Sequence, residues 1–286
     1  MKRMKAQLLF ICSFIVQLAS AQAIGSNNEI DSTILICEYI FKQNVDTISN
    51  EQYHTANFTL EIGHKCSKYY HKNTDKYQRI KSDPKLFALY SAELQQSLTK
   101  SSNHILNFKP LSLEEPLVIY NNFPEGYRTI QDVLFTDHYI YTEENTLQEW
   151  SITNDTISIL GYLCHKAKCN YRGRDYEAWF TLEIPVSKGP WKFAGLPGLI
   201  LKVQDTENHY SFTVSSIIKS VIPIEYIEYS GRKYTKIDRK KILKMEIKMR
   251  SIGLEQYTQM GTLSESPQLS SGANNQNYDL LEKDYR

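Results

Sequence analysis

Short segments in which apolar and polar residues alternate recur along most of the chain. In the segment 174–184, every second residue from Tyr176 to Ile184 is apolar and most of the intervening residues are polar. A period of two is typical of strands with one face on a core and the other in solvent. The same reasoning predicts strands at 33–42, 57–62, 117–120, 138–142, 147–152, 156–160, 162–169, 199–204, 210–215 and 222–229. Because no helices separate most of these strands, they favour antiparallel pairing. A turn at Arg172-Gly173 is expected to join two of them.

Two segments carry apolar residues at helical spacing. The first begins at Asp83-Pro84, a favoured N-cap followed by a favoured first helical residue, and Leu86 and Leu89 recur behind it. The second covers 236–253 and mixes basic residues with Ile, Leu and Met. We therefore predict a mainly β fold, in which one large antiparallel sheet curves into a bowl, half-barrel or sandwich with one or two helices.

The N-terminus has the three-part pattern of a secretory signal peptide. A basic start is followed by an apolar run over 6–18 and by Ala19-Ser20-Ala21 before Gln22. The run is shorter than the ~20 residues that span a bilayer, and no later stretch predicts a transmembrane segment in the mature chain. We expect a signal peptide over 1–21, a single β-rich domain with a C-terminal helix over 22–260, and a flexible tail over 261–286. Few residues in 261–276 could be buried.

Composition and charge exclude one class of partner. The chain has 33 basic and 32 acidic residues, and the predicted signal peptide removes only basic ones. A mature chain so close to neutral lacks the basic footprint expected of a nucleic-acid-binding protein. We therefore predict no nucleic-acid partner.

The cysteines are candidates for disulfide bonds. Four of them, Cys37, Cys66, Cys164 and Cys169, follow the predicted signal peptide. An even number in an oxidising compartment favours pairing, and four cysteines leave three connectivities open. Nearby histidines add metal-ligand types, but their spacing matches no standard metal site. We expect no metal and no cofactor.

The most distinctive segment is a loop rich in glycine and proline. Its characteristic residues are Gly189, Pro190, Trp191, Phe193, Gly195, Leu196, Pro197, Gly198, Leu199 and Ile200. The glycines and prolines predict successive tight turns, and the apolar side chains predict packing against the sheet. None of the six residues 195–200 has an ionisable, nucleophilic or metal-binding side chain, so we interpret this motif as structural.

The same residues carry a family resemblance. Gly195 to Ile200 resembles the signature of the GLPGLI family of exported Bacteroidetes proteins, and the flanking segments 161–167, 172–174, 178–179 and 189–193 are similar too. Residues 278–282 resemble that family's usual ending, although Asp279 and Leu280 depart from its Asn-Pro. The resemblance implies a β-rich cell-envelope protein of a diderm bacterium. The family has no established activity to transfer.

The sequence favours binding over catalysis. A concave sheet rich in tyrosine and phenylalanine can hold a ligand without catalytic residues. We expect a non-catalytic protein of the periplasm or cell surface that binds an envelope protein, lipid, peptide or glycan. The alternative is a secreted hydrolase acting on glycan or peptide, in which Glu177 and Glu183 flank Trp179 on one strand face. No catalytic residue is assigned.

Overall fold

A single large sheet dominates the computed structural model, which describes residues 28–44, 53–100, 117–134, 137–227, 234–248 and 280–284. The strands are β1 (Glu29–Asn44), β2 (Tyr53–Gly63), β3 (Ser67–His71), β4 (Val118–Asn121), β5 (Tyr127–Leu134), β6 (Asp137–Glu144), β7 (Ser151–Ile159), β8 (Tyr162–Tyr171), β9 (Arg174–Thr181), β10 (Leu199–Asp205), β11 (Tyr210–Lys219), β12 (Pro223–Glu225) and β13 (Thr235–Lys236). The helices are α2 (Lys72–Ser82) and α3 (Pro84–Lys100), and residues 239–248 are also helical. The predicted mainly β fold with a large antiparallel sheet is confirmed.

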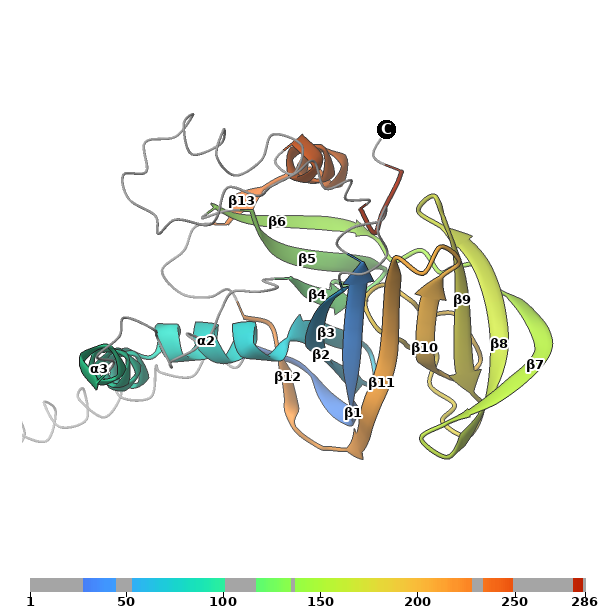
Figure 1. Cartoon of the computed structure of the whole chain (residues 1–286), viewed down its shortest axis with the longest axis horizontal. Helices are drawn as coiled ribbons and strands as arrows, with labels where there is room; N and C mark the ends of the chain where they lie inside the picture. The colour runs from blue at the N-terminus through green and yellow to red at the C-terminus, as the bar shows by residue number, and fades with distance from the viewer. Residues whose placement is uncertain are drawn as a thin grey trace, which may run out of the picture.

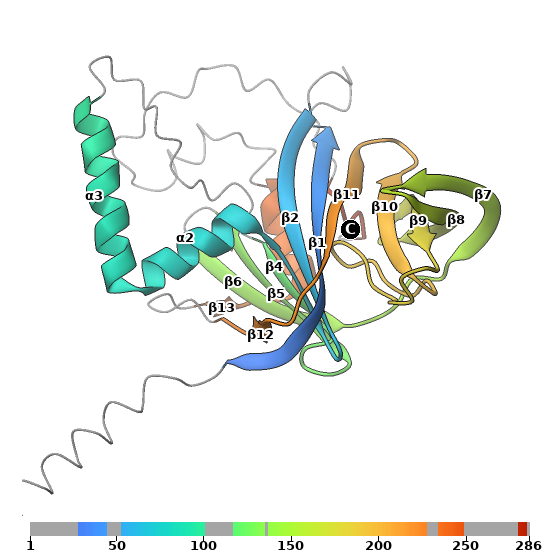
Figure 2. The ribbon, with the colours of Figure 1, turned by 90° about the horizontal axis from the view of Figure 1, so that it is seen from below.

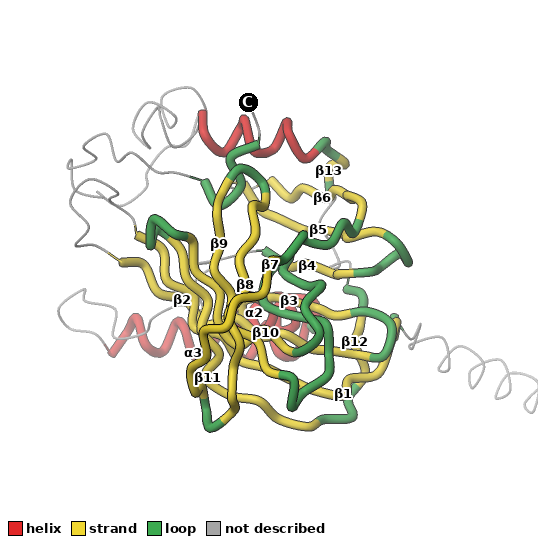
Figure 3. Tube along the Cα trace, turned by 90° about the vertical axis from the view of Figure 1, so that its right-hand side faces the viewer, coloured by secondary structure: helices red, strands yellow, loops and turns green. Residues whose placement is uncertain are grey.

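The sheet is open and 13-stranded, with the order β13-β6-β5-β4-β3-β2-β1-β11-β10-β9-β8-β7 and β12 beside β1. The named strands pair antiparallel except β13, which runs parallel to β6. Strands β1 and β11 lie side by side at its centre, with β2 to β6 on one side and β7 to β10 on the other (Figure 1). Figure 3 views the sheet from the β7 side.

The long central strand β1 explains how this sheet builds its core. Its inner face carries Leu35, Cys37, Tyr39 and Phe41, all of which are buried. They alternate with less buried residues, as the period of two predicts. Phe41 pairs in register with Phe212 of β11, and their rings lie 5.0 Å apart. The core therefore lies on the inner side of the curved sheet.

Local sequence signals set several turns and helix starts. Arg172 and Gly173 both have positive φ, at 53° and 80°, which confirms the predicted turn between β8 and β9. The start of α3 is also confirmed, because Asp83 Oδ1 accepts hydrogen bonds from the backbone N–H groups of Lys85 and Leu86.

The C-terminal helix starts later than the sequence predicts. Asp238 caps it by accepting a hydrogen bond from the backbone N–H of Lys241, and helical structure begins at residue 239. Lys236, which was expected in the helix, instead pairs with Ile140 of β6. Residues 249–253 lie outside the described part.

The helices α2 and α3 extend from the end of β3 away from the sheet (Figure 2). The apolar spacing in α3 predicts a helix correctly but not its burial, because Leu86 is 45% exposed and Leu89 is 64% exposed. Among the described residues, none of the helices combines the length and apolar character needed to cross a membrane.

Several element boundaries differ from the predictions. The strand predicted to end at Ile184 ends at Thr181. Of the strand predicted over 222–229, the described residues 222–227 contain only β12, and residues 228–229 lie outside the described part. Segments 147–152 and 156–160 contribute to one strand, β7, which starts only at Ser151. Strands β3, β5 and β13 and the helix α2 were not predicted. Strand β3 is buried at all five positions, and its sequence has no alternating pattern.

The ends of the chain complete the comparison. Residues 1–21, the predicted signal peptide, lie outside the described part. So do residues 261–279 and 285–286 of the predicted flexible tail. Residues 280–284, however, pack against the domain, with Leu280 and Glu282 buried. This corrects the expectation for that end of the tail, because its charged residues find buried partners.

Candidate functional site

A hollow of about 340 Å³ lies inside the curved sheet. Seven aromatic side chains line it: Phe41, Phe58, Tyr69, Tyr141, Trp191, Tyr210 and Phe212. They come from β1, β2, β3, β6, β11 and the glycine-rich loop. Leu243 and Glu246 of the C-terminal helix and residues 280–282 add a further wall. The sheet thus supplies most of the aromatic lining of this hollow, and elements near the end of the chain help to enclose it.

The aromatic walls are held by contacts between rings. Phe58 stacks on Tyr69 with ring centroids 4.7 Å apart, and Phe41 packs edge-on against Phe58 at 5.8 Å. Trp191 and Phe193 of the loop lie 5.2 Å apart. Each such pair adds about 0.5–1.5 kcal/mol beyond simple burial.

A buried ionic network lies at one end of the hollow. Lys192 is 2% exposed, and its ammonium lies 2.9 Å from Glu143 of β6 and 2.5 Å from Glu282 of the C-terminal segment. Arg128 of β5 pairs with Glu143 at 3.0 Å, and Arg239 pairs with Glu282. These five side chains join four parts of the chain that are distant in sequence.

For Glu143 and Lys192, the charged partners shift the pKa more than burial does. Burial alone would raise the pKa of Glu143, but Lys192, Arg128 and Arg172 lower it below its ordinary value. Burial alone would lower the pKa of Lys192, but the acidic groups around it, with Glu282 the largest influence, raise it. Lys192 is therefore charged at neutral pH and held by its partners.

The C-terminal segment is fastened by its backbone as well as its charges. Arg174 donates two hydrogen bonds to the Leu280 carbonyl oxygen, at 3.1 and 2.9 Å. Tyr176 Oη donates to the Leu281 carbonyl oxygen at 3.0 Å, and the Lys283 N–H donates to the Arg172 carbonyl oxygen at 2.7 Å. The segment is thereby positioned beside the hollow although it forms no strand.

The glycine-rich loop places two backbone features against this site. Trp191 has a positive φ of 53°, which is uncommon outside glycine and costs energy that its burial must offset. The carbonyl oxygen of Lys192 accepts hydrogen bonds from Arg128 and Gln148. Trp150 donates its indole N–H to the Ala194 carbonyl oxygen at 2.7 Å. The loop is therefore tied to β5 and to the connection between β6 and β7.

The structure places the predicted motif residues largely inside the protein. Gly195 and Pro197 are exposed, whereas the other eight are buried: Gly189, Pro190, Trp191, Phe193, Leu196, Gly198, Leu199 and Ile200. Gly195 has a φ of +94°, and a Cβ on Gly198 would lie 1.9 Å from the Thr181 carbonyl oxygen. Gly195 is thus required for its left-handed backbone conformation, and Gly198 for the close approach of the Thr181 backbone.

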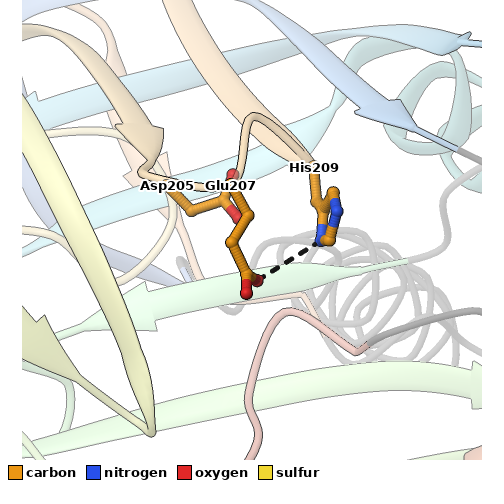
Figure 4. Close-up of side chains that lie close together, drawn as sticks. All are labelled: Asp205, Glu207 and His209. Carbon is orange, nitrogen blue, oxygen red and sulfur yellow. Dashed lines mark ion pairs between the residues drawn. The ribbon is translucent and has the colours of Figure 1, made fainter. Parts of the chain in front are cut away.

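One group of side chains has the composition of a metal site. Asp205, Glu207 and His209 offer ligand atoms within 4.8 Å of one another, and Figure 4 shows the three side chains together. Arg174 already pairs with Asp205 at 2.9 Å, and Lys283 pairs with Glu207 at 2.9 Å. Cations of the chain itself thus neutralise both carboxylates, and we assign no metal to this group.

The four cysteines are buried free thiols, so the expected disulfides are not found. They lie on three separate parts of the sheet: Cys37 on β1, Cys66 just before β3, and Cys164 and Cys169 on β8. Burial raises the pKa of Cys37, Cys66 and Cys169 to about 12 and that of Cys164 to about 11. Among the described residues, no cysteine belongs to a metal-type cluster.

The carboxylates considered for hydrolysis are not arranged as a catalytic pair. Glu177 is bound by Lys166 at 2.9 Å and Lys168 at 3.1 Å, and these lysines lower its pKa. Glu183 lies beyond the end of β9 and accepts a hydrogen bond from the Leu163 N–H. A general acid needs a raised pKa, so Glu177 does not suit that role.

Sequence reasoning missed the charged residues at the base of the hollow. Lys192 and Glu282 both lie within the segments that carry the family resemblance, but they were not singled out. A signal was present in Lys192, a lone charge between Trp191 and Phe193 in an apolar loop. Nothing in the sequence distinguished Glu143 from other strand-end glutamates.

Comparisons with known proteins give a short family match and a distant fold likeness. Residues 172–202, which include the β8–β9 turn and the glycine-rich loop, match the family described as "Protein of unknown function (Porph_ging)". No curated protein matches the chain. Two crystal structures of PNGF-II, in space groups C2 and P21, share 15% and 14% sequence identity with it, at TM-scores of 0.47 and 0.48. Each alignment covers 76% of this chain but only 33% and 34% of the PNGF-II chain, so this chain spans about a third of that protein's length. The site is thus built around a segment that matches a family of unknown function.

Proposed function

We propose that this protein binds a compact apolar or aromatic molecule with a polar end in the hollow inside its sheet. The observation that carries the proposal is the set of seven aromatic side chains around about 340 Å³ of space. Ligand pockets in proteins are mostly apolar clefts of roughly 300–1,000 Å³ with a few polar groups that fix orientation. The hollow matches that description in size and lining.

Two ionisable groups that line the hollow form an ion pair, which favours binding over chemistry. Lys192 and Glu282 reach its lining, but each is held by the other at 2.5 Å. Proton transfer to a substrate would require one of them to give up this partner. A signal peptide over 1–21 would place such a binding protein in the periplasm or at the cell surface.

The test uses the full mature chain and a naphthalene dye that fluoresces in apolar pockets. Val133 lines the hollow from β5, and Val133→Trp should fill part of it. Val221 is 88% exposed and does not line the hollow, so Val221→Trp is a matched control. We expect dye binding to be lost in the first variant and kept in the second, with circular dichroism unchanged in both.

Mass spectrometry of protein purified from its native envelope should then identify a bound compound. That compound should displace the dye from the wild type. If the dye does not bind, or binds Val133→Trp as well as the wild type, the hollow is not a ligand site.

A further inference from the structure

The outer face of the sheet carries two rows of side chains across five strands. They follow from the pairing registers of β8, β9, β10, β11 and β1. One row is Lys166, Trp179, Lys202, Thr213 and Ile40, and the other is Lys168, Glu177, Gln204, Ser211 and Lys42. At about 4.8 Å per strand, each row extends roughly 19 Å. We call these ten residues the outer rows.

The row between them shows which way these side chains face. It consists of Ala167, Ala178, Val203, Phe212 and Phe41, which pair in the same registers, and all five are buried in the core. Successive residues of a strand point to opposite faces. The outer rows therefore face away from the aromatic hollow, and the two sites are separated by the sheet.

A second hollow, of about 560 Å³, lies over the outer rows where β10, β11 and β1 meet. Its lining consists of Ile40, Lys42, Tyr53, Lys202, Gln204, Asn208, Ser211 and Thr213. Within the described part of the chain, neither Lys42 nor Lys202 forms an ion pair. Tyr53 is 53% exposed at the start of β2. The lining is thus rich in hydroxyl, amide and ammonium groups, with one accessible ring.

The charge on the outer rows is one-sided. They contain four lysines and a single carboxylate, Glu177, which Lys166 and Lys168 already neutralise. The whole chain, by contrast, has a formal charge of only +1. A hollow lined by charges of one sign concentrates ligands of the opposite sign.

We propose that the outer rows bind an anionic saccharide, a sugar chain that carries carboxylates or sulfates. Lys42 and Lys202 pair with its acidic groups. Gln204, Ser211 and Thr213 exchange hydrogen bonds with its hydroxyls, since amides and hydroxyls both donate and accept. Tyr53 offers a ring face beside them with a polar tip.

The nature of the basic residues favours this ligand over a nucleic acid. All four cations of the outer rows are lysines, which act as flexible point charges. Arginine, whose planar fork matches phosphate, is the preferred residue for nucleic-acid recognition, and the outer rows contain none. An acidic saccharide carries separate charged groups along a chain of hydroxyls. This arrangement is complementary to the outer rows, where lysines lie among hydroxyl and amide side chains.

The experiment measures binding of polygalacturonate to the full mature chain by titration calorimetry at low salt. Three comparison ligands are its neutral methyl ester, polyglutamate and a single-stranded oligonucleotide. Lys42→Gln with Lys202→Gln should weaken polygalacturonate binding by about tenfold or more. The matched control is Lys240→Gln with Lys244→Gln, which removes the same charge from exposed positions on the C-terminal helix. That control should bind as the wild type does.

A second variant separates sugar recognition from simple charge attraction. Ser211→Ala with Thr213→Val keeps all the lysines but removes two hydroxyls, so it should weaken binding of polygalacturonate and not of polyglutamate. The proposal is overturned if wild type does not bind polygalacturonate, or if both lysine double variants bind it equally. It is also overturned if the methyl ester, polyglutamate or the oligonucleotide binds as tightly as polygalacturonate does. None of these outcomes depends on the inner hollow.

Discussion

Replacing Lys192 with methionine probes the ionic network at the base of the inner hollow. Methionine keeps an unbranched apolar stem but removes the ammonium, which is 2.9 Å from Glu143 and 2.5 Å from Glu282. Each carboxylate then loses one partner and retains an arginine, Arg128 for Glu143 and Arg239 for Glu282. The perturbation is therefore the loss of two charged hydrogen bonds in a buried setting.

The expected magnitude follows from those contacts. Removing one partner of a buried ion pair costs about 3–5 kcal/mol, and a hydrogen bond to a charged group contributes about 1.5–3 kcal/mol. Because the arginines still compensate both carboxylates, we expect a loss near the lower end, about 3 kcal/mol in the free energy of unfolding. In a chain of this size that corresponds to a drop in Tm on the order of 10 °C.

The assay is urea unfolding followed by circular dichroism and tryptophan fluorescence. Lys72→Met is the control, because Lys72 is 67% exposed and pairs with Glu38 at 3.5 Å, and it should cost less than about 0.5 kcal/mol. Adding Glu282→Gln to the wild type and to Lys192→Met closes a double-mutant cycle, with an expected coupling of about 0.5–3 kcal/mol between the two side chains. If Lys192→Met is as stable as Lys72→Met, or the cycle shows no coupling, the reasoning about the network is wrong.

Three further predictions concern the loop, acid stability and the thiols. Gly198→Ala places a Cβ 1.9 Å from the Thr181 carbonyl oxygen, so it should cost about 3 kcal/mol, and an unchanged Tm would contradict the close approach. The pKa of Glu143 is lowered on folding, so its contribution is complete above its ordinary pKa of 4.5 and is lost as the pH falls through the lower folded value. Glu143→Gln should therefore lower Tm more at neutral pH than near pH 3, and an equal effect at both would argue against this charge pairing. Alkylation without reductant should be slow in the native protein, because burial raises the pKa of the thiols. After unfolding it should label all four cysteines, Cys37, Cys66, Cys164 and Cys169. A pair of cysteines that stays unlabelled after unfolding would instead indicate a disulfide.

Part of the fold could be predicted because its determinants are local. The alternation along β1 and β9, the cap at Asp83 and the turn at Arg172-Gly173 each depend on a few neighbouring residues. Strand β3 could not be recognised, because all five of its residues are buried and Lys68 is among them. Lys68 is accommodated there only because Asp75 of α2 lies 3.0 Å from its ammonium.

The candidate site was predicted only in outline. An aromatic concave face was expected from the abundance of tyrosine and phenylalanine, but composition does not say which rings meet. Phe41 and Tyr69 line one hollow because β1, β2 and β3 are neighbours in the sheet. The disulfide expectation came from counting cysteines. It failed because the fold places Cys37, Cys66 and the β8 cysteines on separate parts of the sheet, and Cys164 and Cys169 lie five residues apart along one strand.

The sequence alone determined most of the strands, the chain reversal at Arg172-Gly173 and which loop is distinctive, because propensity, periodicity and turn chemistry act over a few residues. Only the tertiary structure decided what those segments build together. Lys192 and Glu282 are 90 residues apart, yet they share a buried ion pair. The lysines of the outer rows gather on one face only through the registers of five strands. Long-range pairing of this kind depends on the free energy of the whole packed chain, which no local pattern contains.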